Sequence, residues 1–127
     1  MERQLVPAVS PQAALVGYSR AVRVGSHVAV AGTAPVMPDG AECPPDAYGQ
    51  AKRCLEIVVD ALAQAGARPE HVVRTRTFLT RPDIWKDVGR AHGEVFGDIL
   101  PVTTMVVVAA LLDPRWLVEI EADAIVP

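Results

Sequence analysis

The sequence predicts an α+β protein in which two helices cover one face of a mixed β-sheet. Two segments carry apolar residues at helical spacing, and several others are rich in β-branched residues or alternate between apolar and polar positions. Their order is two or three strands, a helix, a strand, a second helix and two strands, which predicts a two-layer arrangement. A chain of 127 residues supports one core, so we expect a single domain over residues 1–127.

The first forty residues predict a small antiparallel unit. Residues 18–24 alternate, with Tyr18 and Arg20 on one face and Ala21 on the other. Gly25 and the serine after it suit a two-residue type II′ turn, and residues 27–31 form the returning strand. The Asp-Gly pair at residues 39–40 indicates a second tight turn.

The first helix is predicted over residues 47–65, with Asp46 as its N-cap and Gly66 just beyond its end. Cys54 lies within its apolar stripe, so we expect buried, free thiols at Cys43 and Cys54, which do not form a CxxC pair. The next strand is predicted over residues 71–79. Its expected faces are residues 74, 76 and 78 on one side and residues 73, 75, 77 and 79 on the other.

The second helix is predicted to follow a capping box formed by Thr80 and Asp83 and to end at Gly97. His92 lies on its apolar stripe, which favours a packed histidine with one satisfied nitrogen over a catalytic base. Strands are then predicted over residues 102–110 and 116–125, joined by a turn at residues 111–115.

The last predicted strand places three acidic residues on one face, namely Glu119, Glu121 and Asp123. Such a row is more often a solvated strand face than a catalytic set. The sheet face that no helix covers carries Val, Thr and Met, and 50% of the whole chain is hydrophobic. A chain this short hides only about two-thirds of its surface on folding, so another copy is the simplest cover for that face.

Charge and general motifs exclude several function classes. The net charge is −3 and no basic cluster is denser than Arg74 and Arg76, which argues against a nucleic-acid partner. No apolar run approaches the about 20 residues that span a bilayer, and residues 1–5 do not resemble a signal peptide. We therefore expect a cytoplasmic protein with no membrane partner. The three histidines are scattered and no phosphate-binding glycine loop is present, so we expect no metal and no cofactor.

Several ordered segments resemble one family. They are residues 18–22 (Tyr-Ser-Arg-Ala-Val), residues 30–35 (Val-Ala-Gly-Thr-Ala-Pro), residues 65–66 with residues 72–78, and residues 118–124 (Val-Glu-Ile-Glu-Ala-Asp-Ala). In this order, from about residue 15 to residue 125, the chain resembles the reactive-intermediate deaminase family (Rid, also called YjgF). The resemblance implies a chorismate-mutase-like fold and a homotrimer with a barrel-like core. It also implies small-molecule sites in three intersubunit clefts and cofactor-free hydrolysis of enamines and imines.

The resemblance assigns site roles to individual positions. Tyr18 matches the family's site tyrosine, and Glu119 matches the acidic residue that positions or activates water. The backbone of Ala31 and Gly32 matches the family's Ser-Gly, so the serine is lost.

The largest departure lies at residues 101–104, where the family has a Pro-Ala-Arg-Ser/Thr motif. This chain reads Pro-Val-Thr-Thr, so Thr103 replaces the arginine that binds the substrate carboxylate. Thr104, Met105 and His92 complete the expected ligand contacts; Met105 matches a family cysteine and His92 a tyrosine. Gly89 takes the place of an asparagine.

Arg76, Arg90 or Arg115 offers a substitute cation, although for Arg76 an ion pair with a neighbouring carboxylate is favoured. The sequence thus predicts a Rid-like protein that binds a small metabolite and has an altered substrate preference, with enamine or imine deamination as its candidate reaction. The first alternative is a trimer that binds or scavenges a metabolite without catalysis, and the weaker alternative is an endoribonuclease.

Overall fold

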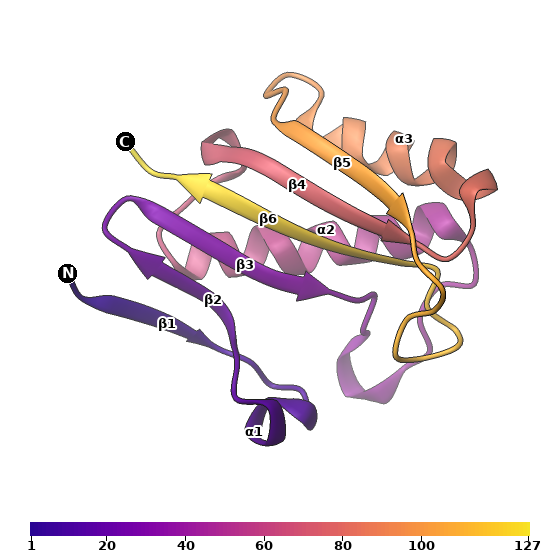
Figure 1. Cartoon of the computed structure of the whole chain (residues 1–127), viewed down its shortest axis with the longest axis horizontal. Helices are drawn as coiled ribbons and strands as arrows, with labels where there is room; N and C mark the ends of the chain where they lie inside the picture. The colour runs from indigo at the N-terminus through magenta and orange to yellow at the C-terminus, as the bar shows by residue number, and fades with distance from the viewer.

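The computed structural model describes all 127 residues and contains one six-stranded sheet with helices on one side (Figure 1). The strands are β1 (Arg3–Pro7), β2 (Ser19–Val24), β3 (His27–Thr33), β4 (Val72–Leu79), β5 (Val102–Val107) and β6 (Val118–Ile125). The α-helices are α1 (Gln12–Val16), α2 (Ala47–Gln64) and α3 (Trp85–Phe96). Short 3₁₀ turns cover Pro38–Gly40, Pro69–His71 and Pro82–Ile84.

The sheet has the strand order β1-β2-β3-β6-β4-β5. Every neighbouring pair is antiparallel except β4 and β5, which are parallel and joined through α3. Helices α2 and α3 pack on the same side of this sheet, and the opposite side, which we call the open face, carries no element (Figure 1). The predicted α+β class with a mixed sheet is therefore confirmed.

The N-terminal segment extends the sheet by a strand that the sequence did not reveal. Strand β1 pairs with β2, and the short helix α1 connects them. Only Val6 of β1 is buried, so the segment lacks the alternation by which a strand is recognised. The hairpin of β2 and β3 is as predicted, because Gly25 has a φ of +59° and no other residue of that turn has a positive φ.

Helix α2 has the predicted ends. The Asp46 carboxylate accepts a hydrogen bond from the Gly49 N–H at 2.8 Å, and Gly66 beyond the helix has a φ of +80°. Cys54 is free and fully buried under the sheet, with its thiol 3.8 Å from the Val118 carbonyl oxygen. Cys43 is also free but only half-buried, because it lies in the loop before the helix rather than on its apolar stripe.

The predicted division of β4 residues between a buried and an exposed face is confirmed except at the start of the strand. Thr75, Thr77 and Leu79 are buried, but Val73 is 43% exposed while Val72 is buried. A β-bulge between Val72 and Arg74 shifts the pairing with β6 by one residue and exchanges the two valines.

The predicted capping box of the second helix is wrong. The 3₁₀ turn Pro82–Ile84 precedes α3, and no side chain caps the helix. The Thr80 hydroxyl instead donates to the Leu117 carbonyl at 3.4 Å, and Asp83 accepts a hydrogen bond from Arg81. A tertiary contact thus uses the Thr80 hydroxyl and a local ion pair uses the Asp83 carboxylate, the two groups that the sequence pattern assigned to the helix terminus.

The loop between β5 and β6 is longer than expected, because β5 ends at Val107 and β6 begins only at Val118. The buried Gln50 of α2 holds this loop. Its amide donates to the carbonyls of Pro44 and Arg115 at 2.8 and 2.9 Å and accepts from the Leu117 N–H at 2.8 Å.

The hydrophobic core lies between the sheet and the two long helices, and alternate residues of β6 point into it. The remaining residues of the central strands point to the open face. Neither long helix is apolar enough over its length to cross a membrane. The register places a mixed set of side chains on the open face: Arg20, Glu119, Glu121, Asp123, Arg74, Arg76, Phe78, Thr104 and Val106.

Candidate functional site

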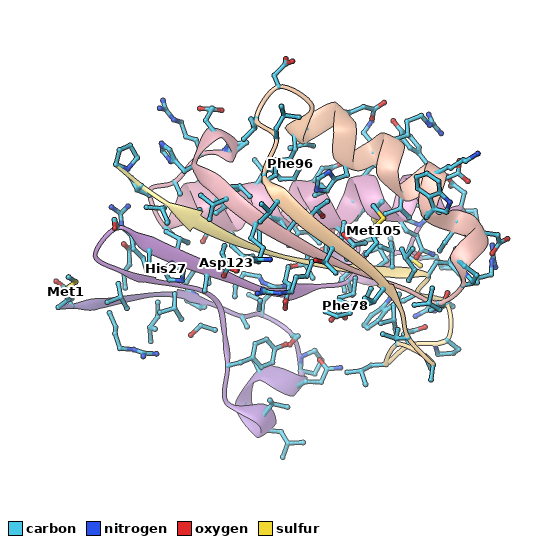
Figure 2. All side chains as sticks on the ribbon, turned by 45° about the horizontal axis from the view of Figure 1, so that its top comes forward. Met1, His27, Phe78, Phe96, Met105 and Asp123 are labelled. Atoms are coloured by element: carbon cyan, nitrogen blue, oxygen red, sulfur yellow. The ribbon has the colours of Figure 1, made fainter.

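The residues expected to form the site lie on two sides of the sheet. Strand alternation places Glu119 and Thr104 on the open face, whereas Thr103 and Met105 point to the helix side. Figure 2 shows Phe78 on the side away from the helices, and Met105 beside α3, the helix that ends at Phe96. Within one chain, therefore, the structure does not bring all the expected contacts together.

The carboxylate of Glu119 lies against the backbone of Gly32. A register shift between Val30 and Thr33 makes β3 irregular at this point and sets Gly32 opposite the acidic row of β6. A Cβ atom on residue 32 would lie 2.6 Å from Glu119 Oε2. Glycine is thus the residue that leaves room for this carboxylate.

Arg20 completes the cluster on the open face and was not among the residues expected from sequence. Its Nη2 donates to the Gly32 carbonyl oxygen at 2.8 Å, and its Nε is buried without a hydrogen-bond partner. The only signal in the sequence was the alternation that sets Arg20 on the same face of β2 as Tyr18. We call Arg20, Gly32 and Glu119 the Glu119 cluster.

Burial determines the electrostatics of this cluster. It raises the pKa of Glu119, an effect that Arg20 opposes and that the neighbouring Glu121 reinforces. Burial likewise lowers the pKa of Arg20, which Tyr18 and Glu119 counteract. The guanidinium and the carboxylate influence each other but do not form an ion pair. Both therefore keep capacity for a ligand.

Tyr18 stands next to the cluster at the edge of a shallow hollow. The residue is 38% exposed, and its hydroxyl is hydrogen-bonded to Ser10 in the loop before α1. The hollow has a volume of about 740 Å³ and is lined mainly by apolar residues of β1, α1, β2 and β3, including Ala31. Because β2 and β3 contribute both to this apolar hollow and to the Glu119 cluster, an apolar surface lies next to the polar groups of the cluster.

The other arginines that were considered as cations already have partners. Arg76 Nη1 lies 3.3 Å from Glu121 Oε1 and 3.2 Å from Asp123 Oδ2, which confirms its interpretation as an ion-paired residue. Arg115 binds Asp113 at 2.8 Å and lowers the pKa of that carboxyl to about 2.

Arg90 stacks on the ring of Tyr48, with its guanidinium 3.8 Å from the ring centroid. Since Tyr48 belongs to α2, Arg90 lies on the helix side of the molecule, away from the Glu119 cluster.

A second polar group lies on the helix side, at the edge of the sheet. The Thr75 hydroxyl is hydrogen-bonded to His92 Nε2 at 2.8 Å and to Thr103 Oγ1 at 2.7 Å. The His92 ring packs 4.7 Å from the ring of Phe96, and burial lowers the pKa of the imidazole. The predicted packed histidine with one satisfied nitrogen is confirmed.

No three histidine, cysteine, aspartate or glutamate side chains converge in a way that would hold a metal ion. The polar groups at the Glu119 cluster and beside it are the half-buried Glu119 carboxylate, the half-buried Arg20 guanidinium and the Tyr18 phenol. Together they can orient a water molecule and bind a small polar ligand.

Comparisons with a family model and with solved structures indicate the same protein family for this chain. The family model "Endoribonuclease L-PSP" matches residues 8–126. A crystal structure from Mycobacterium tuberculosis, of a member of the highly conserved YjgF/YER057c/UK114 family, superposes with a TM-score of 0.90 at 46% identity, covering 98% of this chain and 100% of that one.

Two further proteins extend the comparison. An uncharacterised protein of Streptomyces coelicolor is 40% identical over 115 residues, which are 91% of this chain and 86% of that protein. The structure of E. coli TdcF with bound serine has a TM-score of 0.82 at 27% identity, covering 97% of this chain and 94% of TdcF.

Proposed function

Because this chain belongs to the endoribonuclease L-PSP family, which includes the YjgF and Rid proteins, we propose that it binds a small metabolite at the Glu119 cluster and hydrolyses an enamine or imine there. The observation that carries the proposal is the position of Glu119, a half-buried carboxylate with a raised pKa that lies on the open face against the backbone of Gly32. The serine bound to the related TdcF supports a ligand of that size.

The chemistry needs one group that handles protons. A water molecule held by Glu119 adds its oxygen to the imine carbon, and the carboxylate takes up the proton that the water loses. Glu119 passes that proton to the imine nitrogen, which completes the carbinolamine. Glu119 then takes the proton of the carbinolamine hydroxyl and delivers it to the amino group, so that the C–N bond breaks, ammonia leaves and the C=O bond of the product forms. An enamine enters the same route after tautomerising to the imine. A raised pKa brings the carboxyl closer to neutrality, where it can both accept and donate a proton.

The proposed assembly is a homotrimer with ligand sites between subunits. The open face exposes Val102 and Val106 of β5, and no element of this chain covers them. Two more copies would bury this surface and would bring Thr103 and Met105, from the helix side of one subunit, towards Tyr18 and Glu119 of another. The site is then complete only in the assembly.

The test is a coupled assay that generates 2-aminoacrylate and branched-chain imines in situ. We expect Glu119→Gln to reduce turnover by about 100-fold or more, because it removes the general base. Glu56→Gln is the matched control, since Glu56 is an exposed residue of α2 that pairs only with Arg53. Unchanged turnover in Glu119→Gln would exclude the proposed role of this residue.

The replacement of the family's arginine by Thr103 favours a second candidate, a trimer that binds a metabolite without transforming it. A ligand that raises the melting temperature of the protein, with no product formed from any imine, would indicate this function. Ribonuclease activity has less support because the net charge is −3 and Arg76 of the open face is paired with Glu121 and Asp123. It would require digestion of RNA that Glu119→Gln abolishes.

A further inference from the structure

We propose that Arg20 is the anion-binding residue of this site, and that it selects ligands bearing a carboxylate. This inference rests on the proposed function, because it assumes that the Glu119 cluster is where the metabolite binds. It moves the anion contact from β5, where position 103 is a threonine, to β2 on the open face. The substitution at position 103 would then change the direction from which a carboxylate is bound rather than abolish its binding.

The guanidinium of Arg20 is held in place with most of its donors unused. One Nη2 hydrogen is donated to the Gly32 carbonyl at 2.8 Å, and Nε is buried with no partner. A guanidinium has five N–H donors in a planar fork that matches the two oxygens of a carboxylate. The terminal nitrogens are the donors that a ligand can reach, since Nη1 makes no hydrogen bond within the chain and, unlike Nε, is not buried.

The other arginines on or near the open face do not fit this role. Arg76 is engaged by two carboxylates, Glu121 and Asp123. Arg74 has no ion pair, but it lies opposite Asp123 in the sheet. Asp123 is four residues from Glu119 along β6, about 13 Å in an extended strand. Arg20 is the arginine that shares a backbone contact with the glycine beside Glu119.

The two charges of the cluster suit a 2-imino or 2-oxo acid. Gly32 touches both side chains, so an anion on Arg20 places the adjacent carbon of the ligand near the Glu119 carboxyl. Burial raises the pKa of Glu119 and so favours its neutral form, which does not repel a ligand carboxylate. A neutral ligand of the same shape would gain nothing from Arg20.

The test compares binding of 2-oxobutyrate and 2-oxobutyramide, which have nearly the same shape but differ in charge, by NMR titration of the full-length protein. We expect wild type to prefer 2-oxobutyrate, Arg20→Gln to weaken its binding by about tenfold or more with little change for the amide, and Arg20→Lys to restore part of the loss. Arg81→Gln is the matched control, since Arg81 is exposed and pairs only with Asp83.

Equal affinity of wild type for the acid and the amide overturns the inference, and this measurement needs no variant. Equal weakening of both ligands in Arg20→Gln also overturns it, because that pattern indicates a structural role. Either result leaves the proposed function intact if Glu119-dependent imine hydrolysis is present. If wild type binds neither compound and hydrolyses no imine, the proposed function fails together with the inference.

Discussion

At the scale of single residues, Glu119 combines a proposed catalytic role with a partly buried position that disfavours its charged form. Burial raises its pKa in the folded protein, so the folded state holds this proton more tightly than the unfolded chain does. The carboxyl therefore contributes most to stability at acidic pH, and the contribution is lost as the pH rises through the raised pKa. Above that raised pKa the ionised, partly desolvated group is destabilising.

Glu119→Gln is expected to raise the melting temperature at pH 7.5 while abolishing turnover, because it removes a partly desolvated charge. The difference from wild type should shrink as the pH falls through the raised pKa, where Glu119 is itself neutral. Thermal unfolding of both proteins between pH 4 and pH 8 measures this. A variant less stable than wild type at pH 7.5 would show that Glu119 stabilises the fold.

Gly32→Ala tests the contact between the backbone of β3 and the carboxylate. The added methyl group would lie 2.6 Å from Glu119 Oε2, and Gly32 does not have a positive φ. The flexible glutamate can move away, so we expect a melting temperature near that of wild type and a large fall in kcat. Steady-state kinetics and thermal unfolding of the same preparation measure both effects. Normal kcat would mean that catalysis does not need Glu119 in this position.

At the scale of elements, residues with local signals were predictable and residues fixed by tertiary contacts were not. Helix α2 follows from its apolar spacing, Asp46 and Gly66, and the alternation of β6 follows from its own sequence. The bulges in β3 and β4 arise from pairing with β6, which no single strand reveals. One of them sets Gly32 beside Glu119, so the cluster itself was only partly predictable.

Substitutions of two glycines, one just beyond the end of α2 and one inside α3, are expected to have opposite effects on stability. Gly66 has a φ of +80°, and a methyl group there would lie 2.8 Å from Arg23 Nη1, so Gly66→Ala should destabilise by about 1–2 kcal/mol. Gly89 lies inside α3 with nothing within 4 Å of an added Cβ, so Gly89→Ala should stabilise by about 1 kcal/mol. Urea unfolding of the pair measures both. If both variants changed the free energy of unfolding by equal amounts in the same direction, Gly66 beyond α2 and Gly89 inside α3 would not have the different backbone environments described here.

At the scale of the whole molecule, the two groups of expected site residues lie on opposite sides of the sheet. Tyr18 and Glu119 can meet Thr103 only through a neighbouring copy, which is the structural argument for an assembly with shared sites. The resemblance provided the list of site residues, and the sheet register determines which of them share a face. Arg20 had no counterpart in that list and emerges only from the contact with Gly32.

Sedimentation equilibrium is expected to give three times the 13.5 kDa mass of the chain. Val106 of β5 is 43% exposed on the open face, so Val106→Glu should place charges in the interface and yield monomers. Val9→Glu adds the same charge to a fully exposed loop and should leave the mass unchanged. A monomeric wild type, or a trimeric Val106→Glu, would contradict the proposed assembly.

The buried thiol of Cys54 can report when helix α2 separates from the sheet, because only that separation exposes it to a reagent. Burial raises the pKa of that thiol strongly, whereas Cys43 lies half-buried in a loop. A thiolate-directed reagent thus reaches Cys43 in the native protein and reaches Cys54 only when α2 separates from the sheet. The rate of the slower labelling, at Cys54, would measure that separation without an engineered probe. A bound ligand that stabilises the native sheet would slow the labelling of Cys54.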